Sequence, residues 1–113
     1  MAILTPTTLT NTGIAEASTM ASASSCGDRF KALSNRDFVR VTNGAAATRT
    51  VTIPNQQGGS DIVVVLDTLA NAPANDKTIA FEAIDQFIDD DGYVNLTYSA
   101  VSNVTVGVFR TPA

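Results

Sequence analysis

Histidine is absent from the 113 residues of this sequence, and tryptophan is absent as well. Serine and cysteine catalytic triads need a histidine as general base, and imidazole supplies most ligands of catalytic zinc sites. Because aromatic residues make up only 6% of the chain, a sugar-binding cleft lined by stacked rings is poorly supported. We therefore expect that the protein is not an enzyme and that it uses no cofactor and no metal.

Charged residues are also few, at 16% of the chain against about 25% in a typical soluble domain. The net charge is −4, and there is no run of Lys and Arg, the residues on which affinity for a phosphate backbone depends. We expect no nucleic-acid partner. Thr, Ser, Asn and Ala take the place of the charged residues, which fits an extended protein that assembles with others.

Cysteine occurs once, at Cys26, so no intrachain disulfide can form. No general base accompanies this residue, and we interpret it as a structural or incidental thiol. The first residues, Met1 to Pro6, lack the basic and apolar regions of a signal peptide, and no stretch approaches the ~20 apolar residues of a membrane span. We expect a soluble protein, made in a reducing cytoplasm, with no membrane partner.

The acidic residues Asp89–Asp91, followed by Gly92, raise the question of a calcium site. An EF-hand loop needs an aspartate at its first position and a glutamate at its twelfth. Placing Gly92 at the sixth position puts Phe87 at the first and Tyr98 at the twelfth. This spacing favours a solvated acidic turn before a strand, with calcium binding by an irregular loop as the alternative.

Alternation between apolar and polar residues predicts β-strands along most of the chain. The expected strands are residues 37–42, 48–53, 62–66, 77–82, 93–98 and 104–109, and a further strand in the N-terminal segment is left open. The last two form an antiparallel hairpin in this prediction, and Asn43-Gly44 is the turn between the first two. The continuous apolar run Ile62 to Leu66 predicts a strand that is covered on both faces. A single domain with this strand spacing is typical of a β-sandwich or a small barrel.

Apolar residues in the predicted loops have an expected role in the core. Residues 26–36 are predicted to be a loop from which Phe30 and Leu33 fill the edge of the core. Phe87 and Ile88, in the loop before the fifth strand, are expected to do the same.

The first 25 residues differ in composition from the rest, so we divide the chain into an N-terminal arm or linker, 1–25, and a β-sandwich domain, 26–113. Two interpretations of the first segment compete: a disordered tail, or an arm that orders on a neighbouring subunit. We favour the arm because a tail has no use for its apolar residues, Ile3, Leu4, Leu9 and Ile14.

Three aromatic residues, Phe38, Tyr93 and Phe109, are expected on strand faces opposite the inward-pointing valines. Either the N-terminal segment covers them or they form a contact patch. Of these two, we favour a surface for an oligomer or another partner.

The strand sequences resemble those of small virion proteins of tailed bacteriophages, the capsid cement or decoration proteins. The resemblance spans residues 28 to 110 and rests on strand patterns rather than on a catalytic motif. The segments that carry it are Phe38–Gly44, Thr50–Ile53, Asp91–Ser99 and Val104–Val106. It implies a β-sandwich that binds the outer capsid at joints between major capsid subunits, often as a trimer, with a terminal arm reaching to neighbours.

Together, these observations predict an all-β protein, an antiparallel β-sandwich of jelly-roll or immunoglobulin-like type with an extended N-terminal arm. The expected partners are the major capsid protein and further copies of this chain, with a trimer favoured, and the expected location is the capsid surface after synthesis in the host cytoplasm. A tail, fibre or adhesin module that binds a host surface is the alternative, and a hydrolase is a third, less favoured class. The expected interface residues are Ile3, Leu4, Leu9, Ile14, Phe38, Tyr93 and Phe109.

Overall fold

The computed structural model describes residues 2–10, 13–15 and 19–111. It contains two five-stranded sheets: sheet 1 has the strand order β1-β4-β9-β6-β7, and sheet 2 has the order β2-β10-β5-β8, with β3 also paired to β10. The strands are β1 (Ala2–Leu4), β2 (Thr7–Thr8), β3 (Ala21–Ser22), β4 (Asp28–Lys31), β5 (Asp37–Asn43), β6 (Arg49–Ile53), β7 (Ile62–Leu66), β8 (Asp76–Ala80), β9 (Tyr93–Tyr98) and β10 (Val104–Arg110). Two 3-10 turns, η1 (Leu69–Asn71) and η2 (Ile84–Phe87), flank β8. Within the described ranges, no helix is long and apolar enough to cross a bilayer.

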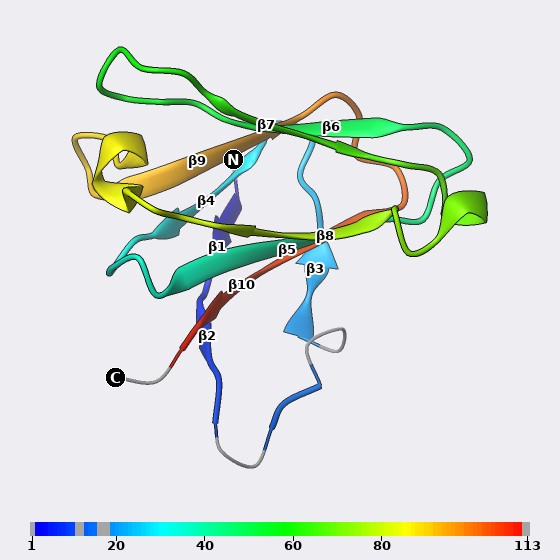
Figure 1. The fold of residues 1–113 in the computed structure, drawn as a ribbon, viewed down its shortest axis with the longest axis horizontal. Helices are drawn as coiled ribbons and strands as arrows, with labels where there is room; N and C mark the ends of the chain where they lie inside the picture. The colour runs from blue at the N-terminus through cyan, green and yellow to red at the C-terminus, as the bar shows by residue number, and fades with distance from the viewer. Residues whose placement is uncertain (1, 11–12, 16–18, 112–113) are drawn as a thin grey trace.

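The two sheets share one hydrophobic core. Strands β6, β7 and β9 lie above β5, β8 and β10 in the view of Figure 1, and alternate residues of both groups point into the space between them. Sheet 1 contributes mainly Phe30, Val51, Ile53, Leu66, Val94 and Leu96, and sheet 2 contributes Val39, Val41, Ile79, Val104, Val106 and Val108. The all-β fold class is therefore confirmed, and all six predicted strands are present.

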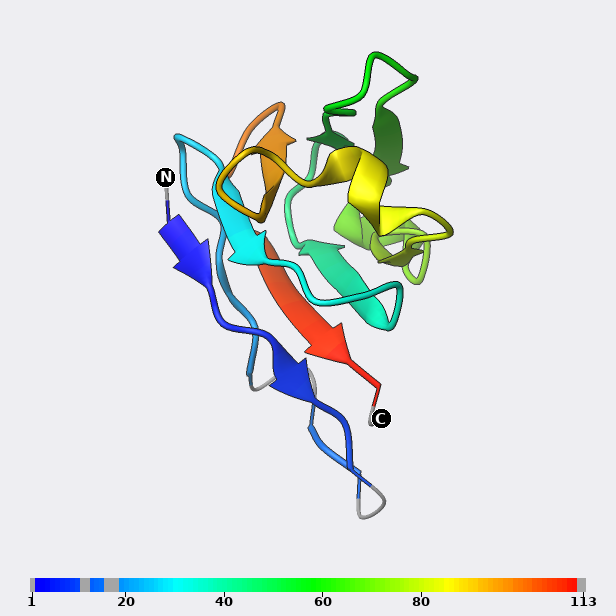
Figure 2. The same ribbon diagram turned by 90° about the vertical axis from the view of Figure 1, so that its left-hand side faces the viewer.

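Both sheets are mixed, so the prediction of purely antiparallel sheets is wrong. Strand β1 pairs with β4 in parallel, and β2 pairs with β10 in parallel. The N-terminal segment passes from sheet 1 to sheet 2, and Figure 2 shows β1 and β2 following one another along one side of the molecule. Two short strands are present where the sequence left one N-terminal strand open, and they add the parallel pairs.

The predicted hairpin of residues 93–109 does not form, although both of its strands do. Strand β9 pairs with β4 and β6 in sheet 1, whereas β10 pairs with β5 in sheet 2. The five residues between them cross from one sheet to the other, with Asn103 at a φ of 61°. A period of two identifies the inward face of each strand but not its hydrogen-bonded neighbour, so the two inward faces meet across the core instead of lying side by side.

The connection after Asn43 is also a crossing between sheets and not a hairpin turn, because β5 lies in sheet 2 and β6 in sheet 1. The Asn43 side chain is completely buried and holds this connection. Its amide nitrogen donates hydrogen bonds to the carbonyl oxygens of Ala47 and Asp67, and its Oδ1 accepts one from the N–H of Ala45. A buried amide with these partners stabilises a wide connection that an Asn-Gly signal alone does not predict.

Residues 28–31 form strand β4 and not part of a loop, because the backbone pairs with β9 on one side and β1 on the other. Phe30 is completely buried, as predicted, but Leu33 is 61% exposed and does not fill the core. Phe87 is buried in η2 as expected, and Ile88 packs against the core while partly exposed.

The described N-terminal residues pair with the chain's own sheets. Leu4 on β1 is buried in the common core, and the N–H of Leu9 donates to the carbonyl oxygen of Arg110 at 2.8 Å. Contact of this segment with a neighbouring subunit stays a prediction, and residues 1, 11–12 and 16–18 of the predicted arm lie outside the described residues. The expected boundary between residues 25 and 26 falls between β3 and β4.

Candidate interaction surface

The outer face of sheet 1, the face away from the core, carries two of the predicted interface residues. Its members follow from the strand registers: Ile3 on β1, Arg29 and Lys31 on β4, Tyr93, Asn95 and Thr97 on β9, Thr50 and Thr52 on β6, and Val63 and Val65 on β7. Ile3 is 57% exposed at one edge of this face. Val63 and Val65, at the other edge, are 59% and 52% exposed. Exposed apolar side chains therefore lie at both edges, with basic residues of β4 next to Ile3 and threonines of β6 next to Val63 and Val65.

Cations cover the ring of Tyr93. The guanidinium carbon of Arg29 lies 4.4 Å from the ring centroid, and Nζ of Lys31 lies 5.2 Å from it. Nζ of Lys31 also donates a hydrogen bond to the carbonyl oxygen of Asp91 at 2.9 Å. Cation–π contacts at a partly exposed site contribute about 0.5–1 kcal/mol each. Tyr93 thus belongs to a mixed cationic and aromatic cluster and not to an apolar patch.

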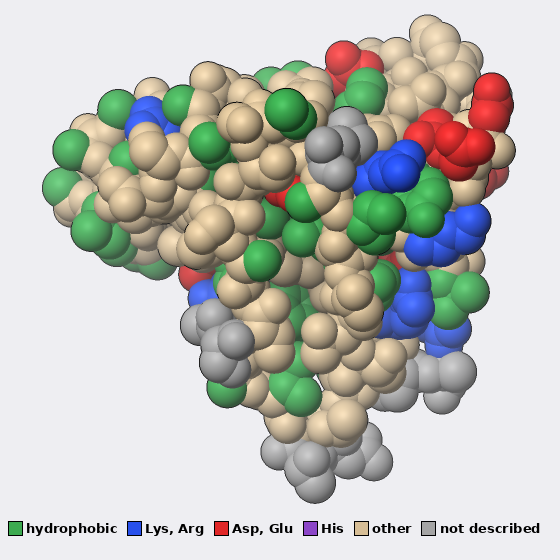
Figure 3. Space-filling view, turned by 180° about the vertical axis from the view of Figure 1, so that it is seen from behind, with side chains coloured by type: hydrophobic (Ala, Val, Ile, Leu, Met, Phe, Trp, Pro, Cys, Tyr) green, Lys and Arg blue, Asp and Glu red, His purple; other side chains and the backbone are tan. Residues whose placement is uncertain are grey.

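Viewed from behind in Figure 3, Lys and Arg side chains gather on the right-hand side of the molecule, with acidic side chains next to them, while hydrophobic side chains are scattered over the rest of the visible surface. Charges of both signs therefore share this part of the surface. A partner that met it would find a mixed pattern and not a single-sign field.

Asp89 organises the acidic turn before β9. Its carboxylate accepts hydrogen bonds from the N–H groups of Asp91 and Tyr93, at 2.9 and 3.0 Å, and from the amide of Asn95 at 3.0 Å. These hydrogen bonds lower the pKa of the Asp89 carboxyl, with the Tyr93 N–H as the largest cause. Both oxygens of the Asp89 carboxylate therefore accept hydrogen bonds from the protein and hold the turn against the start of β9.

Phe38 and Phe109 lie on the outer face of sheet 2, so the structure does not bring them together with Tyr93. They are cross-strand neighbours, and their rings stack with centroids 5.8 Å apart. Phe109 is completely buried. A Cβ at Gly107 would come within 2.8 Å of the Met20 side chain and 3.0 Å of the Phe109 ring, so the segment before β3 packs closely here. For Phe109 the structure therefore supports the alternative of intramolecular cover.

The remaining predicted interface residues are spread over the N-terminal segment. Leu4 is in the core, whereas Leu9 and Ile14 are partly exposed. With Ile3 on the outer face of sheet 1, these four residues do not form one surface.

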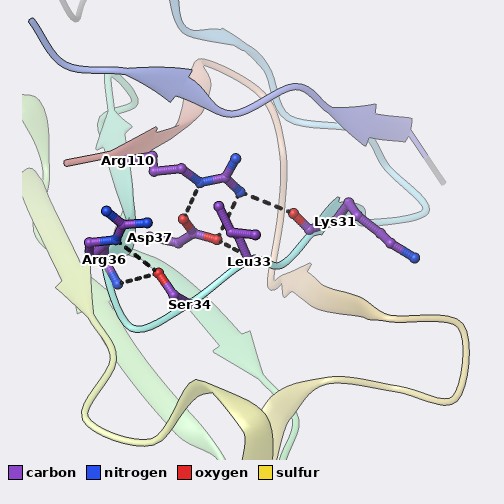
Figure 4. Close-up of polar contacts among 6 residues, drawn as sticks. All are labelled: Lys31, Leu33, Ser34, Arg36, Asp37 and Arg110. Atoms are coloured by element: carbon purple, nitrogen blue, oxygen red, sulfur yellow. Dashed lines mark hydrogen bonds and ion pairs between the residues drawn. The ribbon is translucent and has the colours of Figure 1, made fainter. Parts of the chain in front are cut away.

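A buried ion pair fixes the end of sheet 2 beside Phe38. Asp37 at the start of β5 is completely buried and faces Arg110 at the end of β10 (Figure 4). Arg110 donates to both carboxylate oxygens, from Nε and from Nη2, and the N–H of Leu33 donates to Oδ2 at 2.8 Å. Burial would raise the pKa of the Asp37 carboxyl, but the hydrogen bonds from Arg110 and Leu33 outweigh it, and the pKa lies below its usual 3.8. This pair ties the start of β5 to the end of β10.

A second buried carboxylate, Asp28 on β4, was not singled out by the sequence. Its Oδ2 accepts from the hydroxyl of Tyr98 at 2.7 Å and from the N–H of Ser24 at 3.1 Å. Burial, together with Asp28, raises the pKa of the Tyr98 hydroxyl. Cys26, two residues before Asp28, is exposed and unbonded to another cysteine.

Strand β7 is the part of the surface that sequence reasoning missed. The prediction that Ile62 to Leu66 is covered on both faces is wrong, because β7 is the last strand of sheet 1 and only its inner face meets the core. A β-branched apolar strand has the same composition at the centre of a sheet as at its edge, so no local signal distinguishes the two positions.

Comparison of the chain with protein-family models, with curated proteins and with solved structures gives no match.

Proposed function

We propose that this protein is a structural protein of a bacteriophage virion, a capsid cement or decoration protein that binds the outer shell at joints between major capsid subunits. The proposal includes a β-sandwich as the finer description of the fold, with a jelly-roll or immunoglobulin-like strand order. Two sheets on a common core are consistent with that description, whereas the parallel pairs of β1 and β2 depart from it.

The observation that carries the proposal is the outer face of sheet 1. Its exposed apolar residues are Ile3 at one edge and Val63 and Val65 at the other, and the strands next to Val63 and Val65 contribute Thr50, Thr52 and Thr97. On the side of β6 and β7, threonine methyl groups and valines present a surface that a neighbour can dehydrate without burying a charge, whereas Arg29 and Lys31 lie on the side of β4. The resemblance of the strand sequences to phage decoration proteins favours the major capsid protein as the partner that this face contacts.

A protein of this kind acts by contact and not by catalysis. Binding to the assembled shell but not to its dissociated subunits stabilises the shell by mass action. Many weak copies on one shell add their contributions, so a modest affinity for each copy is sufficient.

The test is to mix the protein with purified expanded capsids of a candidate phage and to measure co-sedimentation and the melting temperature of the shell. We expect saturable binding at a fixed ratio of copies to shell subunits, and a higher melting temperature. Absence of binding would overturn the proposal, and binding of the isolated protein to host cells or glycans would support the adhesin alternative.

A matched pair of variants locates the contact. Thr97→Lys adds a charge to the middle of the outer face of sheet 1, and Thr78→Lys adds the same charge to an exposed position of β8 in sheet 2. Burying an unpaired charge in an interface costs several kcal/mol, so we expect Thr97→Lys to weaken shell binding by about tenfold or more. Equal weakening by both variants would contradict a contact through sheet 1.

A further inference from the structure

Strand β7 presents unpaired backbone groups at the open edge of sheet 1. The N–H of Thr50 on β6 donates to Oγ of Ser99, and the carbonyl oxygen of Thr50 accepts from the N–H of Ser99, both at 2.9 Å. Both backbone groups of Thr50 therefore point away from β7, toward the connection after β9. Thr50 faces Val65, so this is a pair without mutual hydrogen bonds, and the backbone groups of Val65 point outward.

Val63 has the same orientation because backbone direction alternates along a strand. Val63 faces Thr52, whose carbonyl oxygen accepts a hydrogen bond from the hydroxyl of Thr97 on β9, away from β7. Among the described residues, Val63 and Val65 make no backbone–backbone hydrogen bond with a turn, a loop or a residue outside the paired strands. The open edge thus offers two N–H groups and two carbonyl oxygens, spaced for an added antiparallel strand.

The sequence of β7 is complementary to itself. Ile62-Val63-Val64-Val65-Leu66 reads as an apolar palindrome about Val64. If two copies pair antiparallel about a two-fold axis at Val64, Val63 faces Val65 of the other copy and Ile62 faces Leu66. Each directly opposite pair is then apolar, and such cross-strand pairs stabilise a sheet.

This alignment also matches the faces of the two sheets. A two-fold axis perpendicular to a sheet places residues of the same face opposite each other, so the exposed Val63 and Val65 stay together on the outer side. The outward-pointing backbone groups of Val63 and Val65 meet as hydrogen-bonded pairs, giving four N–H···O bonds. Val64 then faces Val64 as a pair without hydrogen bonds, in which the Cα atoms approach to about 4.5 Å.

The strand lacks the features that usually prevent such pairing. Edge strands are protected by charged side chains, proline, bulges or very short length, and β7 has five uncharged residues without proline. Like charges oppose each other only at the ends of this alignment, where Asp61 of one copy would face Asp67 of the other and the two carboxylates would repel.

We propose that two copies of this chain associate through β7, in an antiparallel register centred on Val64. The five strands of sheet 1 in one copy and the five strands of sheet 1 in the other then form one continuous ten-stranded sheet. The occupant of the β7 edge is a second copy because the strand is complementary to itself in sequence, in face and in hydrogen-bonding direction. The contact is small, so association is in the micromolar range or weaker. The inference does not depend on the proposed virion function.

The first test measures the molar mass of the full chain against concentration, by sedimentation equilibrium or by light scattering after gel filtration. We expect a monomer–dimer equilibrium that shifts toward dimer as sodium chloride screens Asp61 from Asp67. The double variant Val63→Lys/Val65→Lys should raise the dimer dissociation constant by about tenfold or more, because each lysine would face a lysine of the other copy. Leu33→Lys, at a similarly exposed leucine in another region, should leave the constant unchanged.

A crosslink tests the register itself. In a Cys26→Ser background, Val64→Cys places two thiols on paired positions within the Cα separation that a disulfide accepts, about 4.4–6.8 Å. The matched variant Val63→Cys places its thiols on diagonal positions, roughly 7–8 Å apart, where a disulfide forms poorly. We expect Val64→Cys to give covalent dimers under mild oxidation several times faster than Val63→Cys.

The proposal would be overturned by a monomer at all concentrations, by a dimer insensitive to Val63→Lys/Val65→Lys, or by equal crosslinking of the two cysteine variants. A stable trimer would also overturn it, since a two-fold strand pairing does not generate three-fold symmetry. If the lysine variant reduced shell binding while the isolated chain stayed monomeric, the occupant of the edge would be a strand of the shell protein.

Discussion

The last strands of the two sheets, β7 and β8, have opposite characters although both contain five residues. Strand β7 is apolar throughout and exposes Val63 and Val65. Strand β8 begins with Asp76 and Lys77, and Lys77 faces Val41 of β5, which points into the core. An exposed lysine on the inward side of an edge strand obstructs the addition of a further strand. The comparison indicates that one edge is protected against pairing and the other is open to it.

Ion pairs connect β8 to β5, and β5 to β10, in sheet 2. Arg110 pairs with the buried Asp37 across β10 and β5, and Arg40 pairs with Asp76 across β5 and β8. On the β7 side, the inner residues of β6 and β7 pack in the apolar core. The two sides therefore differ in what stabilises them as well as in what their edges offer, and each of the following predictions tests one part of that difference.

The largest effect is expected from Asp37→Ala. This change leaves Arg110 without its buried partner and the N–H of Leu33 without an acceptor, so the free energy of unfolding should fall by about 3–5 kcal/mol. Asp76→Ala breaks the other, partly exposed pair and should cost about 0–1 kcal/mol. Urea unfolding followed by circular dichroism measures both values, and equal losses would mean that burial does not distinguish the two pairs.

On the β7 side, a comparable loss should come from removing apolar volume. Leu66 is completely buried, so Leu66→Ala should lower the free energy of unfolding by about 2–5 kcal/mol. The adjacent Val65 is exposed, and Val65→Thr should change the free energy of unfolding by less than about 0.5 kcal/mol. A large loss from Val65→Thr, measured by the same unfolding experiment at low protein concentration, would show that the outer side of β7 is covered within the monomer.

Lowering the pH should reduce the free energy of unfolding through protonation of Asp37, which pairs with Arg110 in sheet 2. Because the pKa of Asp37 in the folded protein lies below its usual 3.8, the carboxylate stabilises the fold above that pH, and this stabilisation is lost as the pH falls through the lower, folded value. We expect the free energy of unfolding to decline below a pH of about 4 in the wild type and to decline less steeply in Asp37→Asn. Parallel curves for the two proteins would exclude Asp37 as a source of the acid sensitivity.

The smallest effect on stability, and the most direct test of the edge comparison, is expected from Lys77→Val. The side chain is exposed, so the free energy of unfolding should change by no more than about 0.5 kcal/mol. Without the lysine, β8 becomes more similar to β7, and we expect additional, concentration-dependent association in light scattering. No new association would mean that Lys77 is not what protects this edge.

Sequence periodicity identified the strands well and their neighbours poorly. The valines of the alternating strands were expected to point inward, and the structure buries Val39, Val51, Val94 and Val106. The hairpin of residues 93–109 was wrong because nothing in the alternation of β9 or β10 states which sheet each strand joins. Strand β4 was missed because its charged residues, Arg29 and Lys31, alternate with Phe30 over only four residues.

The candidate surface was predictable only in part. Ile3 and Tyr93 do lie on one face, the outer face of sheet 1, but Phe109 is buried and Leu4 is in the core. Val63 and Val65 were expected to be covered, and their exposure depends on β7 being the last strand of its sheet.

By itself, the sequence determined the all-β class and the inward face of each main strand, because side-chain direction alternates with every residue and is a local property. Tertiary structure alone decided the pairing of the strands, the parallel N-terminal additions and the identity of the edges. These features depend on contacts between residues far apart in the chain, such as Phe30 with Val94 and Phe38 with Phe109, and no short stretch of sequence encodes them.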